Sequence, residues 1–91
     1  MTGRPSAASA DQVLDLVRGA VGLVLELDPA SLQRETRFVE DLRADSLALV
    51  EIVEIVEEEL TRTRPQFRID DQDLDGLRTL GDAVDYAVAR L

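Results

Sequence analysis

The 91-residue sequence contains no cysteine and no histidine, and all ten of its basic residues are arginine. Without cysteine, no disulfide can stabilise the fold and no thiolate is available for chemistry. Without either residue type, the chain lacks the usual ligands of a zinc site. A nucleophilic serine would also lack histidine or lysine as its general base. These absences argue against catalysis, and we expect a protein that is not an enzyme and holds no metal.

Aromatic residues are scarce, being limited to Phe38, Phe67 and Tyr86, and no run of about 18 apolar residues is present to span a membrane. The N-terminus also lacks an apolar stretch of signal-peptide length. The net charge of −9 disfavours nucleic acid and anionic membranes, because both repel an acidic protein. We therefore expect a small cytoplasmic monomer with no nucleic-acid partner and no membrane partner.

The first part of the chain predicts one helix behind a flexible tail. Residues 1–8, MTGRPSAA, are small and polar and include proline and glycine, so we expect a flexible N-terminal tail. A helix is predicted over 10–26, where apolar residues recur every three or four positions. Ser9 and Gln12 have the spacing of a capping box at its start, and Pro29 lies beyond its end.

Two further helices are predicted by the same periodicity. The second covers 46–60, with either Asp45 or Ser46 as its N-terminal cap. The last begins after Thr79, whose spacing to Asp82 is again that of a capping box, and runs to the C-terminus.

Two loops connect these helices. The loop 28–44 is long, and we expect its scattered apolar residues to hold it on the core: Leu32, Phe38 and Leu42. The loop 61–69 is broken by Pro65 and leads to a short helical turn at 70–75, with Gly76 expected as a left-handed stop. The predicted fold is all-α, an irregular four-helix bundle of three longer helices and one short helix.

Ser46 stands at the start of the second predicted helix and has three interpretations. It is a nucleophile, a plain helix cap, or an acceptor that another enzyme modifies. The missing base speaks against the first, whereas the second is an ordinary role for serine. The third is favoured by the free N–H groups and partial positive charge of a helix N-terminus, which stabilise a phosphate.

Residues 40–60 concentrate negative charge, with eight acids against the single base Arg43. Several acids lie three or four positions apart on the helix, where each like-charge pair costs roughly 0.2–0.5 kcal/mol. The acids are Glu40, Asp41, Asp45, Glu51, Glu54, Glu57, Glu58 and Glu59. Either they form a solvated surface that tolerates this cost, or they form a docking face for Arg and Lys patches on a partner.

The segment 71–82, DQDLDGLRTLGD, has part of the pattern of a calcium-binding loop. The matching residues are Asp71, Asp73, Asp75, Gly76 and Asp82. The final ligand of such a loop is normally a bidentate glutamate, and its eighth place, normally apolar, is Arg78. We therefore interpret the segment as a short acidic turn that precedes the last helix.

Taken together, these segments resemble the acyl carrier proteins. The stretch 38–60, FVEDLRADSLALVEIVEIVEEEL, looks like the signature of that family, with Asp45-Ser46-Leu47 as the attachment triplet. IDDQDL at 69–74 and TLGDAVDYAV at 79–88 are similar to its third helix and to the opening of its fourth. The resemblance identifies 9–91 as an acyl carrier domain, typical of a discrete bacterial carrier.

The resemblance implies that a phosphopantetheinyl transferase attaches 4′-phosphopantetheine to Ser46 and that the thiol of this arm carries acyl groups as thioesters. Further partners would be an acyltransferase, a ketosynthase, or an acyl or adenylate ligase with a basic docking patch. The helix 46–60 would be the recognition helix, with partner contacts from Arg43, Glu51, Glu54 and Glu57. The acyl chain would fold back among the helices against Val50, Val53, Ile69 and Leu74.

Three features depart from the family pattern. Arg43 stands where a glycine is common, Ala48 stands where many fatty-acid carriers have an acid, and the loop 61–68 carries three arginines. They favour polyketide or other specialised-metabolite biosynthesis over fatty-acid synthesis, and the Ala44-Asp45 pair favours an acyl over a peptidyl carrier. A fatty-acid carrier, a peptidyl or aminoacyl carrier, and an unmodified acidic interaction module stay as alternatives.

Overall fold

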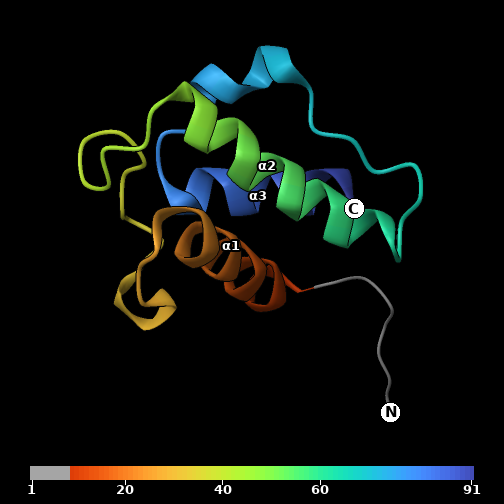
Figure 1. Cartoon of the computed structure of the whole chain (residues 1–91). Helices are drawn as coiled ribbons and strands as arrows, with labels where there is room; N and C mark the ends of the chain where they lie inside the picture. Colours follow the sequence, from red (N-terminus) through yellow and green to blue (C-terminus); the bar gives the residue numbers. More distant parts are fainter. Residues whose placement is uncertain (1–8) are drawn as a thin grey trace.

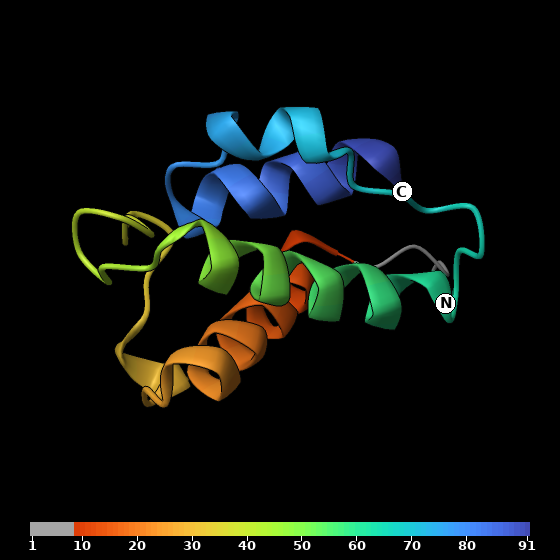
Figure 2. The ribbon, with the colours of Figure 1, turned by 45° about the horizontal axis from the view of Figure 1, so that its top comes forward.

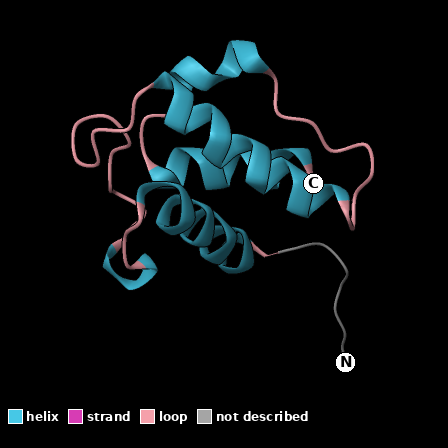
Figure 3. Ribbon diagram, in the orientation of Figure 1, coloured by secondary structure: helices cyan, strands magenta, loops and turns pink. Residues whose placement is uncertain are grey.

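The structure is a computed structural model that describes residues 9–91. The elements follow in the order α1 (Ala10–Leu25), η1 (Pro29–Ser31), α2 (Ser46–Thr61), η2 (Asp71–Gly76) and α3 (Leu80–Arg90), where η marks a short 3₁₀-helix. The described part of the chain contains no strand, only one isolated bridge between Arg37 and Thr79 (Figure 3). The predicted all-α bundle of three longer helices and one short helix is confirmed, and the predicted tail 1–8 lies outside the described residues.

The core lies between the three α-helices. α1 packs against both α2 and α3, and η2 lies on the side of the bundle away from α1 (Figures 1 and 2). The buried residues recur at three- and four-residue steps, so that each helix turns one apolar face inward. They are Val13, Val17, Ala20 and Val21 of α1, Ile52, Val53, Val56 and Leu60 of α2, and Leu80, Val84 and Ala87 of α3.

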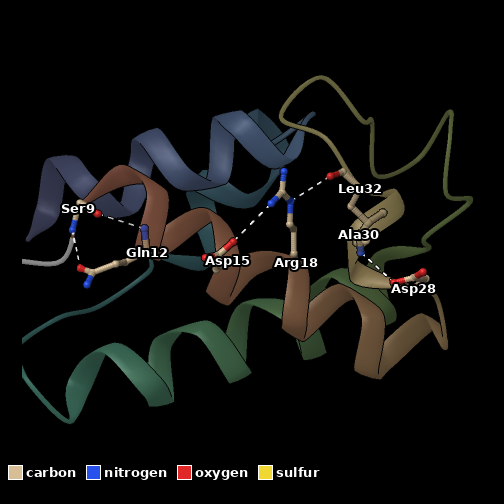
Figure 4. A network of polar contacts seen from close by, with 7 residues as sticks. All are labelled: Ser9, Gln12, Asp15, Arg18, Asp28, Ala30 and Leu32. Atoms are coloured by element: carbon tan, nitrogen blue, oxygen red, sulfur yellow. Dashed lines mark hydrogen bonds and ion pairs between the residues drawn. The ribbon is translucent and has the colours of Figure 1, made fainter.

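Both predicted capping boxes are confirmed. Ser9 Oγ accepts the Gln12 N–H at 3.2 Å, and Gln12 Oε1 accepts the Ser9 N–H at 2.9 Å (Figure 4). At α3, Thr79 Oγ1 accepts the Asp82 N–H at 3.0 Å, and the Asp82 carboxylate accepts the Thr79 N–H at 3.2 Å. Each box pairs two N–H groups that the helix backbone leaves without a partner.

The long loop between α1 and α2 is held at both of its ends. Arg18 Nε of α1 donates to the Leu32 carbonyl at 2.9 Å (Figure 4), and Leu32 and Phe38 are fully buried. The Phe38 N–H donates to the Arg78 carbonyl at 2.9 Å, and the Ala44 N–H donates back to the Phe38 carbonyl at 2.8 Å. The loop therefore lies against the start of α3 and fixes the point at which the chain enters α2.

The predicted roles of Leu32, Phe38 and Leu42 are confirmed, since the first two are buried and the third packs on the core. The expectation for Gly76 is wrong, because no glycine in residues 9–91 has a positive φ. Gly76 instead ends η2, and the next residue, Leu77, turns its side chain into the core at 7% exposure.

Candidate functional site

Ser46 is the first residue of α2, and Asp45 is the cap. The Asp45 backbone is extended, its carboxylate accepts the Ala48 N–H at 2.8 Å, and its carbonyl accepts the Leu49 N–H at 3.0 Å. Ser46 is exposed, and its hydroxyl makes no hydrogen bond within residues 9–91. The sequence left open whether Asp45 or Ser46 caps this helix. The cap is Asp45, and Ser46 has no capping role.

The surroundings of Ser46 suit a phosphate group rather than a reaction at the serine itself. The N–H groups of Ser46 and Leu47 have no partner within the described residues, and the first turn of α2 contains no acidic side chain. A helix N-terminus with free N–H groups carries about half a unit of positive charge, which stabilises a phosphate oxygen. The donor groups present therefore fit a phosphodiester on the Ser46 hydroxyl.

An open groove of about 700 Å³ lies beside Ser46. The apolar part of its lining comes from the loop before α2, from α2 itself and from the region of η2: Val39, Ala44, Leu49, Leu74 and Leu77. The charged part of its lining is Glu40, Asp45, Asp75 and Arg78. Leu47 points away from the core at 69% exposure. The serine thus lies at an exposed edge with an amphipathic groove next to it.

Residues 15–87 match the family model described as "Phosphopantetheine attachment site". The chain is 34% identical over 74 residues to an acyl carrier protein of Clostridium perfringens, which covers 81% of this chain and 91% of the relative. It is 36% identical over 76 residues to that of Chlamydia caviae, covering 84% and 92% respectively. The chain belongs to the acyl carrier protein family.

The fold agrees with this membership. An acyl carrier protein from Enterococcus faecalis superposes with a TM-score of 0.72 at 26% identity, covering 92% of this chain and all of that one. Acyl carrier proteins are not enzymes, and their cofactor is a covalently attached 4′-phosphopantetheine. They receive it from a phosphopantetheinyl transferase and then meet acyl-handling enzymes. In residues 9–91, no helix is long and apolar enough to cross a membrane.

The backbone conformation of Arg43 explains why glycine is common at this position in the family. Its φ is 58°, which is the left-handed region, and its N–H donates to the Val39 carbonyl at 3.0 Å in the turn before α2. A side chain in this region costs roughly 1–2 kcal/mol, whereas glycine adopts it without this penalty. The glycine common in carriers suits the backbone here, and this carrier keeps an exposed arginine in spite of the strain.

The eight acids of residues 40–60 fall into two groups. Asp41 accepts the Arg37 N–H at 2.8 Å, Asp45 caps α2, Glu57 accepts the Ile69 N–H at 2.8 Å, and Glu59 lies 3.6 Å from Arg62. Within the described residues, the other four side chains form no hydrogen bond and no ion pair: Glu40, Glu51, Glu54 and Glu58. Half of the acidic set therefore supports the fold, and half is left to solvent.

Glu51 and Glu54 lie with Glu58 along a shallow groove of about 420 Å³ between α1 and α2. The apolar part of that groove is Leu23, Val24 and Ile55. Of the predicted partner-contact residues, these two glutamates and Arg43 are exposed, whereas Glu57 is half-buried and bonded to the backbone of Ile69. Leu23, which is 71% exposed, was not among the predicted partner-contact residues.

The four residues predicted to line an acyl pocket lie in different places. Val53 and Ile69 line an apolar void of about 10 Å³ between α2 and α3, which has room for about one water molecule. Leu74 lines the groove beside Ser46 instead. Val50 is half-buried and lines neither space. The sequence grouped these residues on one pocket, whereas the structure separates them.

Two carboxylates of the calcium-like segment 71–82 have protein partners. Asp82 accepts N–H groups of Arg78 and Thr79, and Asp73 is bonded to Tyr86 and Arg90. Within residues 9–91, no three acidic side chains are grouped as metal ligands would be. Asp73 and Asp82 thus have structural contacts within the fold, whereas the side chains of Asp71 and Asp75 have no partner within the described residues.

Sequence reasoning missed the contacts of Asp73 with Tyr86 and Arg90. The periodicity of α3 places Tyr86 on its inward face, where a hydroxyl needs a hydrogen-bond partner. That signal predicts an acceptor nearby and does not identify it. Leu23 gave no such signal, because it lies three residues after Ala20 and seven after Leu16 and so fits the same apolar repeat.

Proposed function

We propose that Ser46 receives the 4′-phosphopantetheine arm and that the protein carries acyl intermediates in polyketide or other specialised-metabolite biosynthesis. The observation that supports the attachment point is the Ser46 hydroxyl, exposed and without a hydrogen bond within residues 9–91, at the N-terminus of a helix. It lies inside the matched region 15–87. The arm supplies a thiol that holds acyl groups as thioesters, which explains how a chain without cysteine takes part in such chemistry.

The residues around Ser46 hold the attachment point in place and stabilise charge. Asp45 keeps the first turn of α2 intact through its bond to the Ala48 N–H. The Asp45 carboxylate accepts the N–H of Ala48 and not those of Ser46 and Leu47. These two N–H groups therefore stay available to the phosphate of the arm. The base that deprotonates the serine would come from the transferase, since no histidine or lysine is present.

Incubation with coenzyme A and a promiscuous phosphopantetheinyl transferase tests this attachment point. Intact mass should increase by one phosphopantetheine in the wild type and in Ser31→Ala, and should not change in Ser46→Ala. Ser31 is the matched control, an exposed serine whose hydroxyl donates to the nearby Asp28 carbonyl at 2.7 Å. Equal modification of Ser46→Ala, or no modification of the wild type, would contradict the proposal.

We propose the unpaired acids of α2 as the docking face for basic patches on partner enzymes. Glu51→Arg should slow acyl transfer several-fold at low salt, and the difference should shrink as salt screens the charges. Glu35→Arg is the matched control, because it makes the same charge change at an exposed loop position away from α2. Equal rates for the wild type and Glu51→Arg at every salt concentration would mean that this face is only solvated.

The proposed pathway is based on the three departures from the family pattern, and two of them, Arg43 and Ala48, lie within three residues of Ser46. A fatty-acid carrier is the second candidate, because the relatives that share the fold and attachment site do not exclude it. If Arg43 and Ala48 direct the protein to specialised enzymes, the double change Arg43→Gly and Ala48→Asp should increase loading by a fatty-acid malonyl transferase. A wild-type rate equal to that of the double variant would favour fatty-acid synthesis. A cytoplasmic, monomeric state stays a prediction.

A further inference from the structure

The contacts that hold η2 against α3 meet at Tyr86. Its hydroxyl donates to Asp73 Oδ2 at 2.5 Å and accepts the Asp70 N–H at 3.2 Å. Arg90 donates to the same carboxylate at 3.1 Å, and its guanidinium lies 4.3 Å from the centroid of the Tyr86 ring. We call Asp73, Tyr86 and Arg90 the clasp. It joins the only acid of η2 that has a side-chain partner within residues 9–91 to the end of α3.

The chain just before η2 is anchored separately to α2. The Ile69 N–H donates to Glu57 Oε2 at 2.8 Å, and the Ile69 side chain packs on the core. η2 is therefore attached at its start through Asp70 and Ile69 and in its middle through Asp73. Because η2 has no N-terminal side-chain cap of its own, these outside contacts position it.

η2 and the residue that follows it line an open groove and an interior void. Leu74 lines the open groove beside Ser46, and Leu77, which directly follows η2, lines both that groove and the interior void of about 10 Å³. Tyr86 of α3 also lines the void. The groove of about 700 Å³ and the void are thus neighbours, with Leu77 as the shared wall.

We propose that the clasp controls the entry of acyl chains from the Ser46 groove into the interior, and therefore which cargo is sheltered. With the clasp closed, the interior has no room for an acyl chain, so short acyl groups stay in the groove. Longer chains enter only when η2 and Leu77 move away from α2 and α3. The inference rests on the proposed attachment at Ser46, and the clasp itself can be tested without the arm.

The chemistry of Tyr86 suits a closed clasp at neutral pH. Burial and the hydrogen bond to Asp73 raise the pKa of the Tyr86 hydroxyl above its ordinary value, against smaller opposing effects of the Asp70 backbone and Arg90. The hydroxyl therefore stays protonated and continues to donate to Asp73. The clasp is held by neutral and charge-assisted hydrogen bonds together with one cation–π contact.

Hydrogen exchange of the unmodified protein tests the clasp directly. Tyr86→Phe keeps the ring and removes the hydroxyl, so the Asp70 amide and the amides of 71–77 should exchange up to about tenfold faster. Arg90→Gln should accelerate the same amides. Asp85→Asn is the matched control: Asp85 lies on α3 like Tyr86 and Arg90, but its 2.9 Å ion pair is with Arg34 of the loop before α2, so this change should leave 70–77 unchanged. Unchanged exchange in both clasp variants would overturn the clasp.

An octanoyl-loaded form, with loading verified by intact mass, tests the control of cargo. Methyl NMR signals of Val53 and Ile69 should change little on loading of the wild type and strongly on loading of Tyr86→Phe. Large shifts in the wild type while the amides of 70–77 stay protected would overturn the proposal, as would identical shifts in the two proteins. Failure to gain the arm would instead contradict the attachment at Ser46, and the exchange result would still decide the clasp.

Discussion

The three α-helices begin in two different ways. At α1 and α3, a hydroxyl residue and the residue three positions later bond to each other's backbone N–H. The pairs are Ser9 with Gln12 and Thr79 with Asp82. At α2 only half of this arrangement exists, because Asp45 accepts the Ala48 N–H and an alanine side chain cannot return the bond. Ser46 follows the cap, with its hydroxyl and N–H unpaired within the described residues.

This difference separates serines that stabilise the fold from a serine that is open to modification. Ser9 uses its oxygen inside the molecule, so a group attached there would break the helix cap. Ser46 is one position past its cap, and a group attached there removes no protein hydrogen bond of residues 9–91. The distance from the cap, and not the residue type, distinguishes the two roles.

The largest effect is expected from breaking the support of the α2 N-terminus. Phe38→Ala should reduce the free energy of unfolding by about 3–5 kcal/mol, because Phe38 is 1% exposed and its backbone bonds to Arg78 and Ala44. Urea denaturation measures this loss. The neighbouring Val39→Ala, at 62% exposure, should change stability by less than about 0.5 kcal/mol. Equal losses in the two variants would show that the loop does not fix the site.

The next largest effect on stability is expected from removing the hydroxyl group near the N-terminus of each α-helix. Ser9→Ala and Thr79→Ala should each destabilise the protein by about 1 kcal/mol, since each removes a capping oxygen. In a domain of this size that loss corresponds to about 4–8 °C in Tm. Ser46→Ala should stay within about 0.5 kcal/mol of the wild type. A loss at Ser46 as large as that at Ser9 would remove the distinction.

A smaller effect, of opposite sign, is expected at Arg43. Arg43→Gly should stabilise the protein by about 0.5–1 kcal/mol, because relief of the left-handed strain exceeds the added entropy of the unfolded chain. Thermal unfolding at two salt concentrations measures the gain and shows whether charge contributes. Arg62→Gly, at a C-cap in the right-handed region, should not be stabilising. Destabilisation by Arg43→Gly would indicate that the arginine side chain makes a favourable contact.

The smallest effect is expected from a substitution that makes the N-terminus of α2 resemble those of α1 and α3. Ala48→Glu places a carboxylate at the third helical position, where it can reach the Asp45 N–H and complete a capping box. The stabilisation should be about 0.3–1 kcal/mol and should decrease with salt. Ala48→Gln separates the hydrogen bond from the charge. If neither variant is more stable than the wild type, the missing partner is not what leaves this N-terminus open.

Much of the fold was predictable because it depends on local patterns. The helix ends at Ser9 and Thr79 follow from capping boxes of four residues, and the buried faces follow from the helical period. Ser46 could be proposed as the attachment point because the triplet Asp45-Ser46-Leu47 and its flanking helices lie in one continuous stretch. The conformation of Arg43 could have been anticipated from the glycine that carriers commonly have at this place.

The remaining features depend on contacts between distant segments. Glu57 and Glu51 look alike in sequence, yet only Glu57 meets the backbone of Ile69 after the 61–69 loop returns to α2. In the same way, Tyr86 of α3 bonds to Asp73 of η2, and the sequence pattern of neither element predicts this pairing. The spacing of residues along one helix cannot reveal which side chain a separate loop will reach.

The attachment of the arm to Ser46 can be tested by measuring the intact mass of the protein purified from its own host and then mapping its fragments. One added 4′-phosphopantetheine, with or without an acyl group, is expected on the fragment that contains Ser46 and on no other fragment. An unmodified protein that is active in its pathway, or an arm located on Ser9 or Ser31, would contradict it.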